Sequence, residues 1–400
     1  MCHSVEGREN ADSRTAHQAR NADMCGRHCA ALSVHPCIVS AWMNPEDLKK
    51  ASRPIHGHGG EPVAPTLRRI ADWCEDRNVE FDAYGSGDLV QQFESDVAAL
   101  LGFPAASFMP SGTLAQQVAL RIWAEESGIN HVAMHPTAHL ELHEERGYAH
   151  LHHLMATLVG PRESPMLAEH LSEAPEPLAA VLVELPTREA GGVLPTWAEL
   201  EEIKKEAKDR NIRLHLDGAR LWECGPAYGK PYAEICEGFD SAYVSFYKGI
   251  GALPGSMLLG PEEFVAQAKV WQRRGGGNLC TVTPNVASAA MQLSERLDRM
   301  PALLDRARSL ATSLASIDGI SIKPSPPHIN MFHLYLEMDA RRAIDARNRV
   351  AEEHQLWAFS WVQPASVPDT CWTEVYVGEA AMSIANDDIE AAFKALITHA

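Results

Sequence analysis

Asp217 and Arg220 stand at the end of a segment typical of a buried strand, within the sequence LHLDGARLW. Open α/β sheets bind ligands at the carboxyl ends of their strands, so two charged residues at this point indicate a binding site. A buried carboxylate destabilises the fold by several kcal/mol unless a cation meets it. Asp217 therefore has two candidate partners: Arg220, or the protonated pyridine nitrogen of a bound ligand.

The segment PSGTLAQQVAL places Ser111, Gly112 and Thr113 immediately before an expected helix. Backbone N–H groups and hydroxyls at a helix N-terminus face outward with the positive end of the helix dipole behind them, which suits a phosphate group. The same three residue types also form an ordinary helix cap with a turn. The segment alone is thus compatible with a phosphate site or with a cap.

Lys248 follows an apolar segment and precedes a glycine-rich turn in SFYKGIGALPGS. An amine at such a position is partly desolvated, which lowers its pKa and lets it form an imine with a carbonyl compound. The alternative for a single lysine before glycine is an ordinary surface position. Lys248 is the candidate nucleophile.

The elements that position these residues alternate in type along the chain. AAVLVEL and IRLHLD are typical of buried strands, and the amphipathic helix WAELEEIKKEAKDRN lies between them, which makes a βαβ unit and predicts a parallel sheet. DSAYVSF and GSMLLG add two strands, and NVASAAMQLSERLDRM begins a long helical passage. A smaller α/β unit follows from about residue 300.

The order of the three pieces resembles that of fold-type I pyridoxal-phosphate enzymes. Within that class, the chain resembles the threonine aldolase and β-eliminating lyase family over roughly residues 80–295. The motifs that carry the resemblance are HLDGARLW, SFYKGIGALPGSMLLG, WQRRGGGN, DAYGSGD, PSGTLAQQVAL, TAH and GGVLPTWAEL.

The resemblance implies an α/β protein of fold type I, with a mostly parallel, seven-stranded type of sheet in a large domain and a smaller C-terminal α/β domain. We expect the large, cofactor-binding domain over residues 45–298 and the small domain over 299–400. Residues 1–44 are expected to form a poorly ordered arm, because their composition offers little apolar surface to offset the entropy of ordering.

Carried over residue by residue, the resemblance implies that Lys248 holds pyridoxal 5'-phosphate (PLP) as a Schiff base and that Asp217 pairs with the pyridine nitrogen. Ser111, Gly112 and Thr113 are the phosphate-binding candidates. Keeping the ring nitrogen protonated makes the ring an electron sink, which lowers the cost of a carbanion at the substrate Cα.

The resemblance also implies that His139 stacks on the cofactor ring and that Arg220 lies near the cofactor's phenolic oxygen and the substrate carboxylate. His139 is in addition the best candidate for the base that removes the β-hydroxyl proton, because a neutral imidazole suits proton transfer at neutral pH. Were its segment helical, His135, His139 and His143 would share one face and could bind a metal. We expect the stacking role and no metal.

The predicted activity is a PLP-dependent carbon–carbon lyase, a threonine aldolase-like enzyme of amino acid metabolism that cleaves β-hydroxy-α-amino acids to glycine and an aldehyde. The alternative is a PLP-dependent β-eliminating lyase or racemase acting on another amino acid, because the bond that breaks depends on which substituent at Cα is perpendicular to the ring. A non-catalytic protein that keeps the fold is the third possibility, and the presence of Lys248 argues against it.

The sequence departs from the family pattern where the substrate is recognised. Arg188 stands in ELPTREAGG where the family usually has a histidine, and the small-domain segment CWTEVYVG has Thr373 and Glu374 where an arginine is expected. Leu279 replaces the arginine after the triple glycine. Arg188 could therefore supply the missing carboxylate contact, together with Arg220. The alternative for Arg188 is a salt bridge to Glu189 or Glu184.

Composition limits the partners. A formal charge of −18 at pH 7 disfavours nucleic acid and anionic lipid, which leaves a small amino-acid substrate as the expected partner. No apolar run is long enough for a membrane span or a signal peptide, so we expect a cytoplasmic protein.

Nine scattered cysteines indicate reduced thiols, and the group Cys25, His28, Cys29 and Cys37 lacks a second close pair for a zinc site. The resemblance implies a homodimer or homotetramer, with DAYGSGD and RRGGG near the shared boundary.

Overall fold

The structure is a computed structural model that describes residues 44–175 and 177–399. The arm predicted over residues 1–44 lies outside the described residues, except for Asn44, and so does the group formed by Cys25, His28, Cys29 and Cys37. The Oδ1 atom of Asn44 accepts a hydrogen bond from the Glu46 N–H at 3.1 Å and caps helix α1 (Pro45–Ala51).

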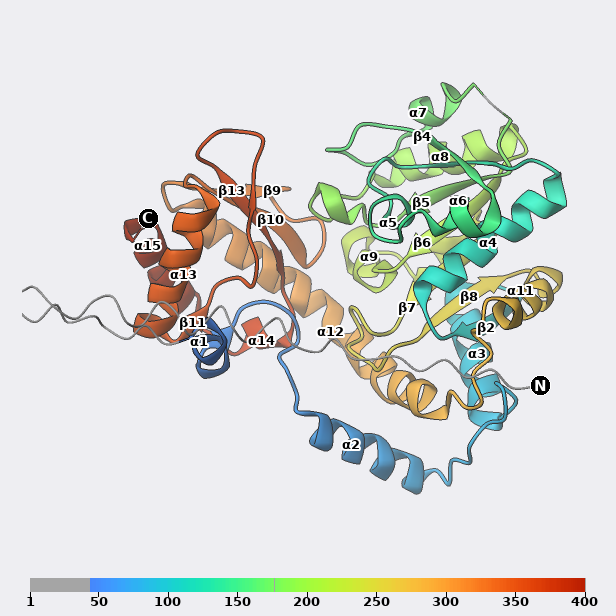
Figure 1. The fold of residues 1–400 in the computed structure, drawn as a ribbon, viewed down its shortest axis with the longest axis horizontal. Helices are drawn as coiled ribbons and strands as arrows, with labels where there is room; N and C mark the ends of the chain where they lie inside the picture. The colour runs from blue at the N-terminus through green and yellow to red at the C-terminus, as the bar shows by residue number, and fades with distance from the viewer. Residues whose placement is uncertain (1–43, 176, 400) are drawn as a thin grey trace, which may run out of the picture. The chain divides into compact units, whose positions relative to one another are not determined.

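A seven-stranded sheet is the largest sheet in the described residues (Figure 1). Its strands follow the order β2 (Ala105–Met109), β8 (Ser256–Gly260), β7 (Ser241–Ser245), β6 (Arg213–Gly218), β5 (Ala180–Glu184), β3 (His131–Met134) and β4 (Met155–Leu158). Only β8 runs antiparallel to its neighbours, so the predicted mostly parallel sheet is present. The register places Glu184 beside Asp217 and His215 beside Ser241.

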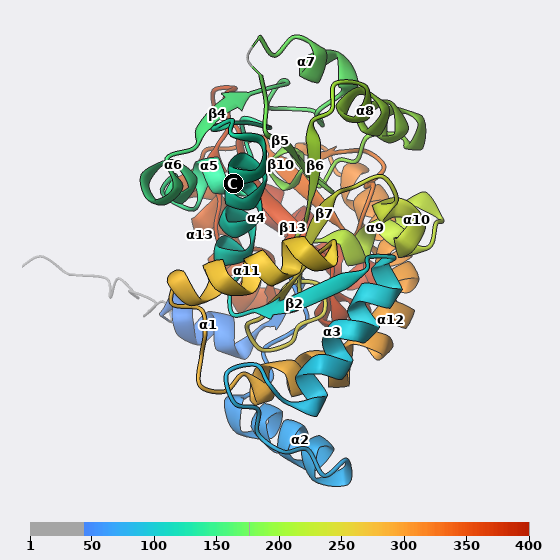
Figure 2. The ribbon, with the colours of Figure 1, turned by 90° about the vertical axis from the view of Figure 1, so that its right-hand side faces the viewer.

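Helices cover both faces of this sheet, as Figure 2 shows. One face packs on α4 (Gly112–Ser127) and α11 (Glu262–Arg274). The other packs on α3 (Asp88–Leu101), α8 (Trp197–Asp209), α9 (Leu221–Tyr228), α10 (Tyr232–Cys236) and the first half of α12 (Thr283–Ala315). Because successive strand residues point to opposite faces, Leu214 and Leu216 lie in the second core while His215 and Asp217 point toward α4.

Short helices follow the strands at the rim of the sheet. They are α5 (His139–Leu142), α6 (Gly147–His152), α7 (Ala168–Ser172) and the 3-10 helix η1 (Arg188–Ala190). Helix α8 begins with the capping box Thr196 and Glu199, a start signal that its sequence already carries. Helix α2 (Val63–Asp76) lies outside the sheet layers and buries only Ile70 among its residues.

The C-terminal part contains a four-stranded antiparallel sheet, whose order is β12 (Gln363–Pro364), β13 (Cys371–Tyr376), β10 (Met331–Leu336) and β9 (Ile320–Lys323). Its helices are α13 (Ala340–His354), α14 (Glu379–Met382) and α15 (Asn386–Thr398), and β1 (Arg53–Pro54) pairs in parallel with β11 (Leu356–Trp357). Helix α12 runs without interruption through residue 298, so the division into domains 45–298 and 299–400 stays a prediction.

Of the helices in the described residues, none combines the length and the apolar character that crossing a membrane requires.

Candidate active site

Lys248 lies in the loop that follows β7, at the carboxyl end of the central sheet. Burial lowers the pKa of Lys248 to about 8; the Arg220 guanidinium also lowers it, while Asp217 and Glu184 act in the opposite direction. This amine therefore loses its proton more readily near neutral pH than an ordinary lysine does. The uncharged amine is the form that attacks a carbonyl.

Asp217 lies at the end of β6 and is 1% exposed. Its Oδ2 accepts a hydrogen bond from Nε2 of Gln116 at 2.5 Å, and its Oδ1 accepts one from the Ala219 N–H at 3.0 Å. Among the described residues Asp217 makes no ion pair with Arg220, so the first partner suggested by the sequence is not the one in the structure. The second, the pyridine nitrogen of a ligand, stays a prediction.

The start of α4 lies where the sequence placed it. The Ser111 Oγ accepts a hydrogen bond from the Leu114 N–H at 3.2 Å, which is the ordinary cap contact. Gly112 is buried against Tyr243 of β7, and a Cβ at this position would overlap the tyrosine hydroxyl. The side chain of Thr113 is exposed. Within residues 44–175 and 177–399 the N–H groups of Gly112 and Thr113 bind no acceptor, which leaves two donors for an anion.

His139 is the first residue of α5, and its side chain is partly exposed. Its Nδ1 lies 2.9 Å from Oε1 of Glu144, and its ring lies 5.1 Å from that of His143, centroid to centroid. His135 precedes the helix and is turned toward Thr137, so the three imidazoles do not share one helical face. The described residues contain no cluster of three potential metal ligands.

Arg220 caps the N-terminus of α9 and is surrounded by acids. Burial acts to lower the pKa of Arg220, but the carboxylates of Glu374, Glu223 and Glu184 raise it above its usual value. Glu374 comes from β13 of the small sheet, where the family pattern led us to expect an arginine. A carboxylate of this protein therefore lies near the guanidinium to which the resemblance assigns the substrate carboxylate.

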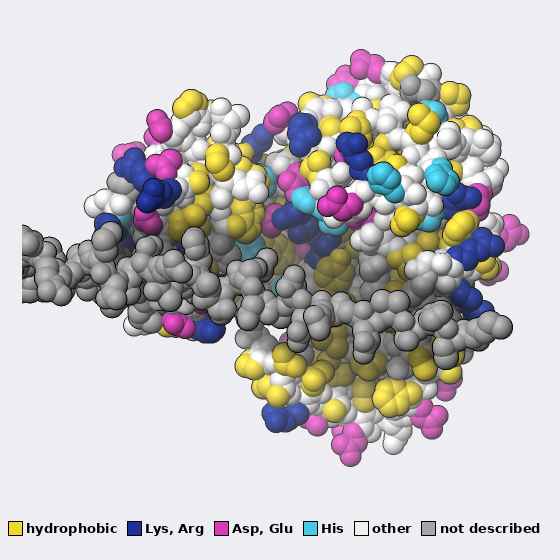
Figure 3. Space-filling view, viewed as in Figure 1, with side chains coloured by type: hydrophobic (Ala, Val, Ile, Leu, Met, Phe, Trp, Pro, Cys, Tyr) yellow, Lys and Arg dark blue, Asp and Glu magenta, His cyan; other side chains and the backbone are white. Residues whose placement is uncertain are grey.

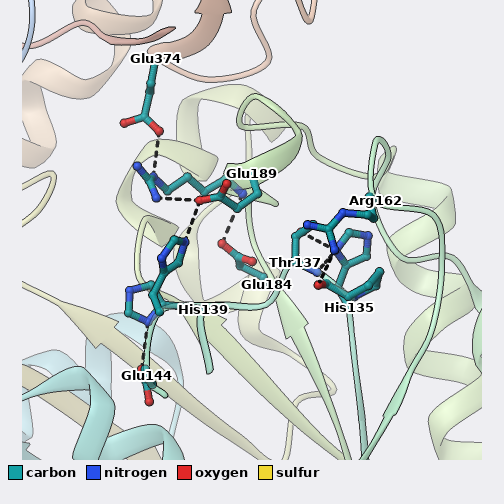
Figure 4. A network of polar contacts seen from close by, with 11 residues as sticks. His135, Thr137, His139, Glu144, Arg162, Glu184, Glu189 and Glu374 are labelled. Carbon is teal, nitrogen blue, oxygen red and sulfur yellow. Dashed lines mark hydrogen bonds and ion pairs between the residues drawn. The ribbon is translucent and has the colours of Figure 1, made fainter. Parts of the chain in front are cut away.

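Arg188 forms one of the two ion pairs that its alternative interpretation offered, the pair with Glu189, and one that the sequence did not suggest, with Glu374 (Figure 4). Its Nη1 lies 2.8 Å from Oε1 of Glu189, and its Nε lies 2.8 Å from Oε2 of Glu374. Glu184 meets only the backbone N–H of Arg188, at 3.2 Å. The same Oε1 of Glu189 also lies 2.9 Å from Nε2 of His143, which links this network to α5.

Two glutamates near Lys248 and Arg220 were not predicted from the sequence as residues of the site. The Glu223 Oε1 accepts a hydrogen bond from the Tyr376 hydroxyl at 3.1 Å, and burial raises the pKa of Glu223 to about 7. Burial and the neighbouring Asp217 raise the pKa of Glu184 to about 8. In both glutamates Oε2 is buried and has no hydrogen-bond partner within the described residues. Two unpaired acceptors beside Lys248 and Arg220 are typical of a site that receives a ligand.

His56 and Tyr376 complete this side of the site from distant parts of the chain. The His56 Nδ1 accepts a hydrogen bond from the Tyr376 N–H at 3.2 Å; burial lowers the pKa of His56, although Glu374 acts to raise it. Glu223 could have been noticed in the sequence, because it closely follows the DGAR motif on an apolar helix. No local pattern marks Tyr376 or His56.

The family model for beta-eliminating lyase matches residues 63–337. The chain belongs to this family. A solved structure from Listeria monocytogenes, of a protein assigned as an L-allo-threonine aldolase, superposes with a TM-score of 0.84 at 38% identity and covers 89% of this chain and 99% of that one. The low-specificity L-threonine aldolase 1 of Arabidopsis thaliana is 25% identical over 286 residues, which are 69% of this chain and 80% of the relative.

A second solved structure, from Exiguobacterium, is assigned as an aromatic amino acid beta-eliminating lyase/threonine aldolase. It superposes with a TM-score of 0.83 at 38% identity and covers 88% of this chain and 99% of that one. The predicted family and the fold-type I architecture are thus confirmed, and membership of the beta-eliminating lyase family makes the chain a lyase.

Proposed function

We propose that this chain is a PLP-dependent aldolase that cleaves threonine-like β-hydroxy-α-amino acids to glycine and an aldehyde. The observation that carries the proposal is the juxtaposition of Lys248, whose pKa burial lowers to about 8, with Asp217, a buried carboxylate that accepts hydrogen bonds from Gln116 and from the Ala219 N–H. The family and its threonine aldolase relatives support the same activity.

The residues present fit PLP. Lys248 supplies the amine that would bind the cofactor's aldehyde, and Asp217 supplies an acceptor for the ring N–H. The N-terminus of α4 offers two free N–H donors for the phosphate. The hydroxyls of Ser111 and Thr113 lie beside these donors. When bound, PLP supplies an electron sink for the electron pair left at Cα after a bond there breaks.

The Glu144 carboxylate selects the tautomer of His139. A carboxylate accepts hydrogen bonds, so the neutral imidazole holds its proton at Nδ1, 2.9 Å from Glu144 Oε1. Nε2 then has a free lone pair and would be able to accept the proton of a substrate β-hydroxyl if the imidazole stacks on the cofactor ring as the resemblance implies. His139 thus combines stacking with the role of general base.

Arg220 is the group that we assign to the substrate α-carboxylate. Its charge is fixed, because the surrounding acids raise its pKa, and a guanidinium offers two parallel donors to a carboxylate. Arg188 acts on the substrate site through Glu374. Its Nε lies 2.8 Å from Oε2 of Glu374, so the negative charge of Glu374 is shared between two guanidinium groups and is not spent on Arg220 alone. The substrate carboxylate must compete with Glu374 for this cationic pair.

A second copy of the chain completes the assembly that we propose, a homodimer or homotetramer in the cytoplasm. Large apolar side chains are exposed on α2 and in, or directly next to, the segments DAYGSGD and RRGGGN: Val63, Leu67, Phe81, Tyr84 and Leu279. Figure 3 shows hydrophobic side chains over α2 at the bottom of the view. The two loops are tied together, since the Tyr84 N–H donates to the Cys280 carbonyl at 2.9 Å. Exposed large apolar side chains of this kind are typical of an interface.

The test is a panel of β-hydroxy amino acids incubated with the purified protein, with glycine, aldehyde, ammonia and α-keto acid assayed separately. Glycine and aldehyde in equal amounts are expected. Ammonia and keto acid without glycine would instead establish β-elimination, and loss of optical purity alone would establish racemisation. Borohydride reduction followed by mass spectrometry is expected to leave the cofactor on Lys248.

A further inference from the structure

Behind Asp217 lies a buried chain of polar side chains that the proposed chemistry does not use directly. Gln116 of α4 is 2% exposed, and its Nε2 lies 2.5 Å from Asp217 Oδ2. Its Oε1 lies 3.2 Å from Nε2 of His215. The orientation of the amide follows from the carboxylate: the opposite one would place two acceptors against each other. Gln116 therefore donates to Asp217 and must accept from His215.

This orientation fixes the proton on His215. The imidazole is fully buried, and burial lowers the pKa of His215 to about 4, so the ring is neutral at physiological pH. Because Nε2 donates to Gln116, its proton is on Nε2, and Nδ1 is an acceptor. The Ser241 hydroxyl, 2.8 Å from Nδ1, must then donate to it. Ser241 in turn accepts from Nε1 of Trp123 at 2.8 Å.

All four hydrogen bonds thus point the same way, from Trp123 through Ser241, His215 and Gln116 to Asp217. Hydrogen bonds aligned in one direction polarise one another, so the last donor is stronger than an isolated amide. We propose that Gln116 and His215 are positioning residues that hold the Asp217 side chain as an acceptor aimed at the ring nitrogen of PLP. The proposal rests on the proposed function, because that nitrogen belongs to the cofactor.

The fold explains how the chain is assembled. His215 and Asp217 are two residues apart on β6 and point to the same face of the sheet. Ser241 is the register partner of His215 on β7. Gln116 and Trp123 are two helical turns apart on α4, so both face the sheet. A helix and two adjoining strands therefore hold every donor rigidly.

The test measures the affinity of the cofactor-free protein for two ligands. One is PLP, and the other is its 1-deaza analogue, in which C–H replaces the ring nitrogen. Both carry the aldehyde and the phosphate, and only PLP can use Asp217. The wild-type chain is expected to prefer PLP. Gln116→Leu is expected to reduce the ratio of the two affinities about tenfold, the effect of losing one hydrogen bond to a charged group.

Gln117→Leu is the matched control. Gln117 is the next residue on α4, is 4% exposed, and donates to Glu144 at 3.1 Å instead of to Asp217. The Gln117→Leu variant is expected to change the affinities for PLP and for 1-deaza-PLP by the same factor, so that their ratio stays unchanged. His215→Phe is the second variant, should Gln116→Leu fail to fold; it is expected to lower the ratio in the same direction by a smaller factor.

The outcomes separate this inference from the proposed function. If the wild-type chain binds neither ligand, the proposed function itself fails. If it prefers PLP but folded Gln116→Leu and His215→Phe keep that preference, the hydrogen-bond chain does not act on the ring nitrogen and the inference is overturned. Equal losses of both ligands in Gln116→Leu would likewise overturn it, because they would indicate a general structural defect.

Discussion

The two sides of the candidate site differ in how completely their polar groups are paired. Around Asp217 every donor meets an acceptor, from Trp123 to the carboxylate. Around Arg220 three acids gather, and two of them, Glu184 and Glu223, each leave a buried oxygen without a partner in the described residues.

The difference follows from the elements that build each side. The Asp217 side comes from α4, β6 and β7, which pack as one unit across the face of the sheet. The Arg220 side comes from the end of β5 and from η1, α9 and β13, so that residues of two separate sheets meet. Unpaired buried acids cost stability and persist where a ligand restores the balance. We infer that the paired side is preorganised for the cofactor and that the unpaired side receives the substrate.

The largest expected effect is that of Lys248→Ala. Activity should fall at least about a thousandfold, because the variant loses both the nucleophile and a group that can carry protons. Borohydride trapping of the cofactor at this position should disappear, while noncovalent PLP binding, measured by dialysis, should persist through Asp217 and α4. Activity and trapping equal to the wild type would show that Lys248 does not anchor the cofactor.

Glu223→Gln tests whether the substrate side is destabilised by its acids. The pKa of Glu223 is raised from an ordinary value of 4.5 to about 7 in the folded chain, so the folded state binds the proton more tightly than the unfolded state. Proton binding by Glu223 therefore stabilises the folded state. This contribution to the free energy of unfolding is fully present below pH 4.5 and is lost as the pH rises through 7, and it amounts to about 3 kcal/mol for this pKa shift. Glutamine does not titrate and should not show this loss.

The measurement is the free energy of unfolding at pH 5 and pH 8 for the wild type and for Glu223→Gln. The exposed Glu202→Gln on α8 is the control and should follow the wild type at both values. An unchanged difference between the wild type and Glu223→Gln at the two pH values would show that Glu223 is already ionised at low cost.

The same comparison explains what the sequence could predict. Asp217, Lys248 and the start of α4 are positioned by local elements, a strand end, a loop and a helix N-terminus, whose patterns are visible in the sequence. The strands around them were predicted for the same reason. Tyr376 and Glu374 reach the site only through the packing of one sheet on another, and no local pattern reports such a contact.

Arg188 shows this limit most directly. The sequence indicated both that Arg188 lies near the substrate and that it could form a salt bridge to Glu189, and the ion pair is present. The second pair, with Glu374, joins Arg188, which stands where the resemblance led us to expect a histidine, to one of the two residues in the segment where we expected an arginine. The two departures from the family pattern therefore form a single ion pair, Arg188 with Glu374. This pair depends on the packing of the seven-stranded sheet against the four-stranded sheet, so the sequence alone does not reveal it.

Arg188→Ala is expected to raise KM about tenfold with little change in the cofactor spectrum. Without Arg188, the guanidinium that remains near Glu374 in the described residues is that of Arg220, so Glu374 competes more strongly with the substrate carboxylate for Arg220. Adding Glu374→Gln should therefore restore most of the lost affinity. A KM that stays equally high in the double variant would indicate that Arg188 contacts the substrate itself, and an unchanged KM in Arg188→Ala would remove it from the site.

The smallest expected effect belongs to Ser111→Ala, on the paired side. The Ser111 Oγ accepts from the Leu114 N–H, so its loss should destabilise the cofactor-free protein by about 1 kcal/mol, as for other helix caps. The hydroxyl can also donate its own proton to the phosphate, so PLP affinity should fall about fivefold. Thr196→Ala, which removes the cap of α8, is the control: it should lower stability and leave PLP affinity unchanged. If Ser111→Ala behaves like this control, Ser111 is a cap alone, and the phosphate is held by the backbone of Gly112 and by Thr113.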